Sequence, residues 1–242
     1  MNATATATVN TSAASNYDEA ADYIWNNSFD KPTLVVSRAR VGVQYDALQA
    51  GLGDARIHYA VKANPAPEII RMLVERGSGF DAASRQEIEL CLSQGADPAK
   101  ISFGNTIKRG VDIAFAHSIG VTMFAADCEA ELDKIAEHAP GARVYIRLIV
   151  ENSMADWPLT RKFGCAGSLL PSLLEYTKSV GLVPYGLSFH VGSQTRRAEY
   201  WHPVLDQVAP LWHAAKEAGH DLQLLNIGGG FPAYHGDPVD AP

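Results

Sequence analysis

From residue 57 onward, short apolar and β-branched runs alternate with longer segments of helical periodicity. This alternation is typical of repeated βα units around a parallel sheet. We expect seven strands, at residues 57–62, 79–83, 101–104, 122–125, 143–150, 186–190 and 222–227. Helices are expected between them: Pro67 suits a first helical turn, and Gly77 a stop after the last one.

Candidate chemistry falls at or near the C-terminal ends of these strands, at Lys62, Asp81, Arg147, His190 and Gly228. In a (β/α)8 barrel the active-site residues come from the C-terminal ends of several strands, whereas a doubly wound sheet binds its ligand at one crevice. We therefore predict an α/β fold of the (β/α)8 TIM-barrel type. Seven strands leave such a barrel one strand short.

The first residues are rich in Ala, Thr, Ser and Asn, with no positively charged start and no continuous apolar stretch. They lack the parts of a signal peptide. We expect residues 1–28 to be a disordered or poorly ordered leader and residues 29–242 to be the barrel domain. No apolar run of roughly 18 residues follows, so no membrane span and a cytoplasmic location are expected.

The composition is that of an ordinary globular protein, with 47% hydrophobic and 19% charged residues. A net charge of −7 argues against a nucleic-acid-binding surface, although one small phosphate needs only a local site. The three cysteines, Cys91, Cys128 and Cys165, form no Cys-x-x-Cys pair, and no His-Glu-x-x-His pattern occurs. Neither a disulfide framework nor a metal site is predicted.

Lys62 closes an apolar strand-like run, where an isolated ammonium is costly unless it is neutralised or used chemically. The alternative is a lysine that extends its ammonium to water. Arg147 stands alone among the apolar residues 144–150 and needs an anionic partner, for which Asp81 is the candidate.

Four segments, 59–64, 79–84, 188–193 and 226–232, resemble the fold-type III pyridoxal-phosphate decarboxylases in order and spacing. That family includes ornithine, lysine, diaminopimelate and arginine decarboxylases. The resemblance runs from about residue 31 to residue 232, and residues 156–165 look most like bacterial ornithine or lysine/ornithine decarboxylases. It implies an alanine-racemase-like barrel that binds pyridoxal 5'-phosphate.

By this resemblance, Lys62 and His190 are catalytic: Lys62 forms the Schiff base with the cofactor, and His190 stacks on its ring. The resemblance assigns cofactor binding to Lys62, Asp81, Arg147, His190, Ser193, Gly228, Gly229 and Gly230. Glu87 matches an acidic position of the family site, and Lys162 a position near the dimer interface. Asn226 departs from the family, because an aspartate is common there.

The resemblance implies decarboxylation of ornithine or lysine to putrescine or cadaverine, in polyamine biosynthesis, by a homodimer. Family members continue with a Glu-Pro-Gly-Arg strand and a C-terminal β-domain. Neither occurs here, so we expect a barrel truncated before its last strand. The alternative is a non-catalytic or incomplete barrel that acts by binding the cofactor or a partner. A racemase is disfavoured because residues 189–193 follow the decarboxylase pattern.

Overall fold

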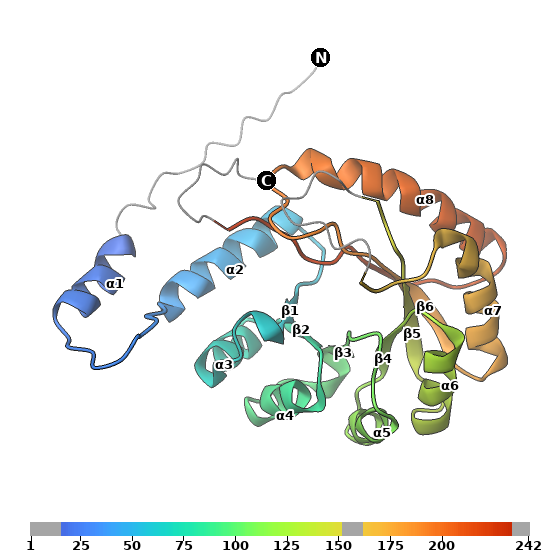
Figure 1. Cartoon of the computed structure of the whole chain (residues 1–242), viewed down its shortest axis with the longest axis horizontal. Coiled ribbons are helices and arrows are strands. Elements are labelled where there is room, and N and C mark those ends of the chain that lie inside the picture. Colours follow the sequence, from blue (N-terminus) through green and yellow to red (C-terminus); the bar gives the residue numbers. More distant parts are fainter. Residues whose placement is uncertain (1–15, 152–161, 234–242) are drawn as a thin grey trace, which may run out of the picture.

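The computed structural model describes residues 16–151 and 162–233. Seven strands form one parallel sheet in which each strand pairs with the next along the chain. They are β1 (His58–Ala60), β2 (Gly79–Ala82), β3 (Ile101–Phe103), β4 (Met123–Ala126), β5 (Arg143–Arg147), β6 (Val183–Ser188) and β7 (Leu224–Asn226). The order never reverses, which rules out a doubly wound sheet. Figure 1 shows the sheet curled into an open barrel, as predicted.

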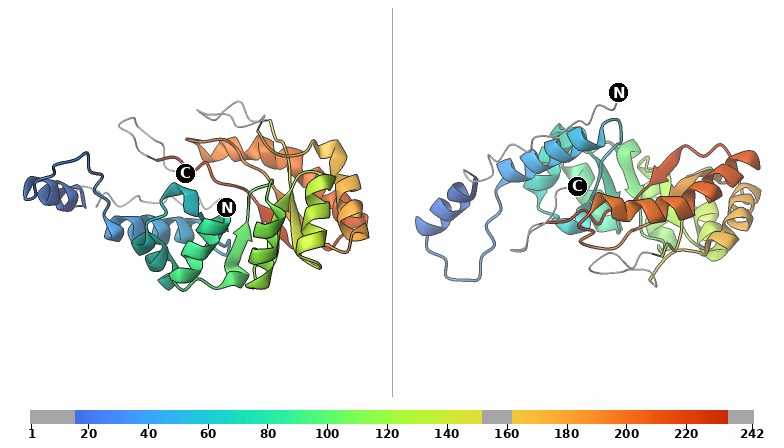
Figure 2. Two further views of the ribbon diagram at one scale, coloured as in Figure 1. Left: turned by 60° about the horizontal axis from the view of Figure 1, so that its bottom comes forward. Right: turned by 90° about the horizontal axis from the view of Figure 1, so that it is seen from above.

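Six helices follow the strands and line the convex side of the sheet (Figures 1 and 2). They are α3 (Pro67–Glu75), α4 (Arg85–Ser93), α5 (Gly110–Ser118), α6 (Glu129–His138), α7 (Leu170–Ser179) and α8 (His202–Glu217). The main hydrophobic core lies between sheet and helices and includes the fully buried Phe80, Phe124 and Ile146. The predicted signals hold: α3 begins at Pro67, and Gly77 follows it with φ 80°.

A second, smaller cluster lies on the other face of the strands. Met123, Ala125 and Tyr145 are buried there, with Tyr185 and Leu224 packed against them. Successive residues of a strand point to opposite faces, so Arg147 shares the inward face of β5 with Tyr145. This interior face carries the polar chemistry described below.

Several strand boundaries differ from the prediction. β1 ends at Ala60 and continues as a 3-10 turn, η2 (Val61–Ala63). β5 ends at Arg147 because the backbone then pairs with the segment around Cys165, whose N–H donates to the Arg147 carbonyl at 2.9 Å. β6 covers Val183–Ser188 rather than residues 186–190.

Two helices precede the barrel strands. α1 (Asn16–Trp25) lies inside the segment for which composition predicted disorder, and both views of Figure 2 show it standing apart. The division at residue 28 itself stays a prediction. α2 (Arg38–Leu52) contacts the barrel helices through an ion pair of 3.2 Å between Asp46 and Arg76. None of the helices in the described ranges combines the length and the hydropathy that a membrane crossing requires.

Candidate active site

The C-terminal edge of the sheet brings most of the predicted site residues together. Asp81 lies in β2 and Arg147 ends β5, while Lys62 follows β1 and His190 follows β6. The charges of Lys62 and Arg147 act on both Asp81 and His190, which places the four side chains around one site.

The glycine run after β7 packs directly on the loop after β6. A Cβ at Gly228 would collide with the carbonyl oxygen of Phe189, and one at Gly230 with that of Gly192. Thr195 N–H donates to the Gly230 carbonyl at 2.9 Å and holds the two loops together. Among the hydrogen bonds of the described chain, none is donated by the N–H of Gly229 or Gly230. These N–H groups are free to bind an anion.

Replacing Gly230 by alanine is expected to destabilise the fold by about 1–3 kcal/mol, because φ of 94° is strained for alanine and the new Cβ would meet the Gly192 carbonyl. Denaturant unfolding measures this free energy. Gly229→Ala is the matched control, since its Cβ would meet nothing closer than His190 Nε2 at 3.9 Å. Equal losses in the two variants would contradict the explanation.

The geometry keeps the His190 ring neutral. Its Nδ1 accepts the Gly192 N–H at 2.9 Å, so the single ring proton belongs on Nε2. Burial, aided by the positive charges of Arg147 and Lys62, lowers the pKa of His190 to about 4. A neutral imidazole that is half-buried at this edge can stack on a flat ligand without adding charge.

This shift predicts a pH dependence of stability. The pKa of His190 is about 4 in the folded protein, whereas an unfolded histidine titrates near 6.5. Between these values the unfolded chain binds the proton more readily, so the free energy of unfolding falls as the pH drops from 6.5 toward 4. The size of this contribution is on the order of 2 kcal/mol. His190→Asn is expected to flatten the slope of unfolding free energy between pH 6.5 and 4, and exposed His213→Asn in α8 is not. An unchanged slope in His190→Asn would rule out this origin.

Asp81 and Arg147 do not form the direct pair that the sequence suggested. Their charges interact, yet no ion pair joins them in the described residues. Burial raises the pKa of Asp81 and lowers that of Arg147. The Arg147 guanidinium lies 5.5 Å from the centre of the Phe163 ring. Arg147 therefore contacts the Phe163 ring and interacts at longer range with the charges of Asp81 and Asp127.

Lys62 departs from the prediction of a buried lysine. It is exposed and lies in the 3-10 turn η2 that follows β1. The turn is fixed from both sides: Tyr59 Oη donates to the Asn64 carbonyl at 3.3 Å, and Asn64 Oδ1 accepts the Ala66 N–H at 3.1 Å. Its amine is therefore not desolvated by the strand, but it is held at the rim and open to a ligand.

The sequence also named Ser193, Glu87 and Lys162. Ser193 is exposed on the loop that carries His190. Glu87 accepts the Ala83 N–H at 2.7 Å and so fixes the turn after β2. Lys162 is exposed, with its Nζ 5.4 Å from the centre of the Phe163 ring. Residues 156–161 of the predicted family segment lie outside the described residues.

Sequence reasoning missed Asp127, which follows β4. Its Oδ2 accepts the Gly164 N–H at 2.9 Å, and its charge acts on Arg147. It thereby holds the segment that presents Phe163 to Arg147. The available signal was position, because Asp127 is an acidic residue at the C-terminal end of an apolar strand, as Asp81 is near the end of β2.

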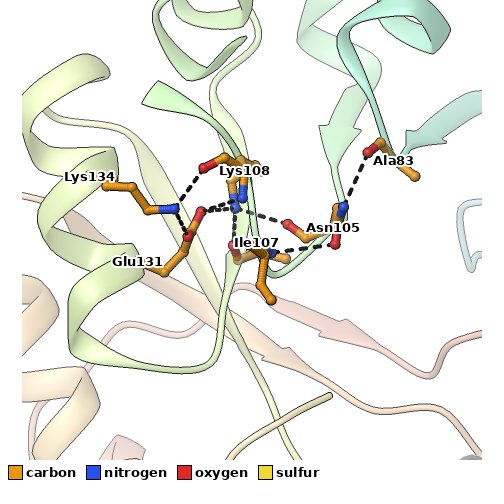
Figure 3. Close-up of polar contacts among 7 residues, drawn as sticks. Ala83, Asn105, Ile107, Lys108, Glu131 and Lys134 are labelled. Atoms are coloured by element: carbon orange, nitrogen blue, oxygen red, sulfur yellow. Dashed lines mark hydrogen bonds and ion pairs between the residues drawn. The ribbon is translucent and has the colours of Figure 1, made fainter. Parts of the chain in front are cut away.

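Sequence reasoning also missed a buried ionic network around Lys108, in the loop after β3 (Figure 3). Lys108 Nζ donates to the carbonyls of Asn105 at 2.9 Å and Ala125 at 2.6 Å, and pairs with Glu131 at 2.9 Å. Glu131 also pairs with Lys134 at 2.6 Å. Burial lowers the pKa of Lys108 to about 8, against the opposing effect of Glu131.

The Lys108 network ties neighbouring loops of the rim together. Besides accepting from Lys108, Asn105 donates through Nδ2 to the Ala83 carbonyl at 3.4 Å, so the loops after β2 and β3 and helix α6 are connected (Figure 3). No group of three or more His, Cys, Asp or Glu side chains that could hold a metal ion occurs in the ranges 16–151 and 162–233.

Comparison with known proteins gives consistent matches. The family model described as pyridoxal-dependent decarboxylase, pyridoxal binding domain, matches residues 38–240. A decarboxylase of Aspergillus flavus is 37% identical over 89% of this chain and 50% of its own length. The lysine/ornithine decarboxylase of Selenomonas ruminantium is 37% identical over 83% of this chain and 51% of its own length.

A solved structure shares the fold. The lysine/ornithine decarboxylase of Vibrio vulnificus, complexed with putrescine, aligns with a TM-score of 0.81 and 30% identity, over 96% of this chain and 61% of its own. The chain thus spans about half the length of the two curated relatives it matches.

Proposed function

Because the chain belongs to the pyridoxal-dependent decarboxylases and carries their pyridoxal-binding domain, we propose that it serves the decarboxylation of a basic amino acid with pyridoxal 5'-phosphate. The observation that supports this most is the convergence of Lys62, His190 and the glycine run on one edge of the sheet. The relatives named lysine/ornithine decarboxylase suggest ornithine or lysine as substrate and putrescine or cadaverine as product, hence a role in polyamine biosynthesis.

The described residues fit the phosphate of this cofactor. Gly229 and Gly230 offer unused N–H groups, and the left-handed conformations of Gly228 and Gly230 let the backbone approach an anion without side chains in the way. The exposed hydroxyl of Ser193 lies on the loop that packs against these glycines and would add a donor.

The described residues also fit the ring. The neutral His190 would stack on its face, while Asp81 and Arg147 would border it. Lys62 would hold the cofactor aldehyde through its amine and yield that place to the amine of the substrate. When bound, the cofactor supplies an electron-withdrawing ring that stabilises the negative charge left on Cα after CO2 departs.

The rest of the proposal concerns the whole protein, because the relatives are about twice as long as this chain. We infer a homodimer located in the cytoplasm, as the family resemblance suggests. The competing proposal is a barrel that binds a partner without catalysis. The presence of Lys62 favours the enzyme, because partner binding alone needs no amine at this position.

A titration tests the proposal. Pyridoxal 5'-phosphate is added to the protein, its visible absorbance is followed, and ornithine or lysine is then added while CO2 release is measured. An absorbance change with cofactor and a second change with ornithine or lysine support an enzyme site. Absence of any cofactor binding would contradict it and favour the partner-binding alternative.

A further inference from the structure

The Asp81 carboxylate, inside the barrel, is enclosed by groups that the family resemblance does not assign. Ser102 lies beside Asp81 in the sheet, as its registered neighbour on β3. Its hydroxyl donates to Asp81 Oδ1 at 2.9 Å, and Ser102 is itself 3% exposed. This hydrogen bond favours the carboxylate and opposes the effect of burial on the pKa of Asp81.

The second neighbour of the Asp81 carboxylate is Gly104, just after β3. A Cβ at this position would collide with Asp81 Oδ1. Since the collision involves the carboxylate itself, the absence of a side chain at Gly104 leaves room for Asp81 in this rotamer. The Lys108 network holds the same loop through the Asn105 carbonyl.

The third group is the hydroxyl of Tyr145, which enters from β5. Tyr145 is 2% exposed, and its hydroxyl has no hydrogen-bond partner within the described part of the chain. It lies close enough to Asp81 that the carboxylate charge, after burial, raises the pKa of the phenol. A buried hydroxyl without a hydrogen-bond partner is unfavourable for folding, and such local costs are expected at functional sites.

We propose that Ser102 is a positioning residue that holds the Asp81 carboxylate inside the barrel and favours its charged form toward the cofactor site, with the buried Tyr145 hydroxyl as a weaker neighbour. The role toward the cofactor rests on the function proposed above, while the hold on Asp81 does not. The other charged groups that act on Asp81 are Lys62 after β1, Glu87 of α4 and Arg147 of β5. Lys62 and Arg147 favour the carboxylate, and Glu87 opposes it.

The test reads the Asp81 proton directly in the ligand-free protein. With side-chain carboxyls of aspartate labelled with carbon-13, NMR follows their titration, and Asp81→Asn identifies the signal of Asp81. Ser102→Ala removes a hydrogen bond to a charged group and is expected to raise the midpoint by about one pH unit. Tyr145→Phe is expected to raise it by less. Tyr185→Phe, an interior tyrosine of β6 whose ring contacts Arg143, is the matched control and is expected to cause no shift.

A second measurement connects this hold to the cofactor. Ser102→Ala is expected to weaken binding of pyridoxal 5'-phosphate about tenfold if the midpoint shifts as predicted. If the unaltered protein does not bind the cofactor, the proposed function fails while the NMR titration still tests the hold on Asp81. If the midpoint is the same in the unaltered protein, Ser102→Ala and Tyr145→Phe, the inference is overturned. If Tyr145→Phe changes only the stability and not the midpoint, the Tyr145 hydroxyl has no effect on Asp81.

Discussion

Lys62→Ala is expected to abolish the absorbance change that pyridoxal 5'-phosphate produces on binding and to lower decarboxylation by on the order of 10⁴-fold. Alanine has no amine, so the cofactor aldehyde would find no covalent partner at the end of β1, and the substrate amine would react without displacing an enzyme group. Absorbance spectra of the variant with added cofactor, followed by measurement of CO2 release, provide the check.

Two further variants separate the amine from its charge. Lys62→Arg keeps a positive charge near Asp81 and His190 but no reactive amine, so it should fail as completely as alanine. Lys100→Ala removes an exposed lysine directly before β3, at the opposite end of the sheet, and should retain the spectrum. A normal spectrum in Lys62→Ala would refute the assignment of Lys62.

Glu131→Gln is expected to destabilise the protein by about 3–5 kcal/mol, the largest effect on stability that the structure suggests. Glu131 is 2% exposed and is the carboxylate shared by Lys108 and Lys134, so glutamine would leave two ammonium groups with no anion between them. Lys108→Met is expected to cost less, about 2–3 kcal/mol, because Glu131 keeps Lys134 and only two carbonyls lose their donor. Denaturant unfolding of both variants measures the difference.

The double variant Lys108→Met/Glu131→Gln tests whether the pair acts as a unit. It should be more stable than the sum of the single losses predicts, since neither buried charge of the pair remains. The pH offers an independent signal: the pKa of Lys108 is about 8, below the 10.5 of an unfolded lysine, so this group makes stability rise between pH 8 and 10.5. Lys108→Met should lose that rise, and additive single losses would contradict the coupling.

The order and number of strands could be predicted because each strand is a short apolar run bounded by helical periodicity. Strand ends were harder. Leu148 to Val150 continue the apolar pattern of β5, yet the chain leaves the strand after Arg147 because its backbone pairs with Cys165, a contact that local sequence does not reveal. Lys62 was placed at the end of the first strand, whereas it is exposed in the 3-10 turn that follows β1.

The rim residues could be proposed because each follows its own strand, but their mutual contacts could not. Ser102 is a small polar residue in an apolar run and gives little signal by itself; its meaning depends on the register that sets it beside Asp81. The sequence pattern identifies Tyr145 only as a core aromatic residue, and the lack of a hydrogen-bond partner for its hydroxyl is visible only in the structure of the described residues. Such partners depend on register between strands that are far apart in sequence.

The sequential order of the sheet has a consequence for how the chain folds. Each strand from β1 to β6 pairs with the next one along the chain, so each strand pair closes one βα unit, whose described residues contain a single α-helix. Pairing of this kind can advance one βα unit at a time from the N-terminal side. During synthesis on the ribosome, β1 and β2 can therefore associate long before the glycine run after β7 has been made, and the phosphate site is assembled after them.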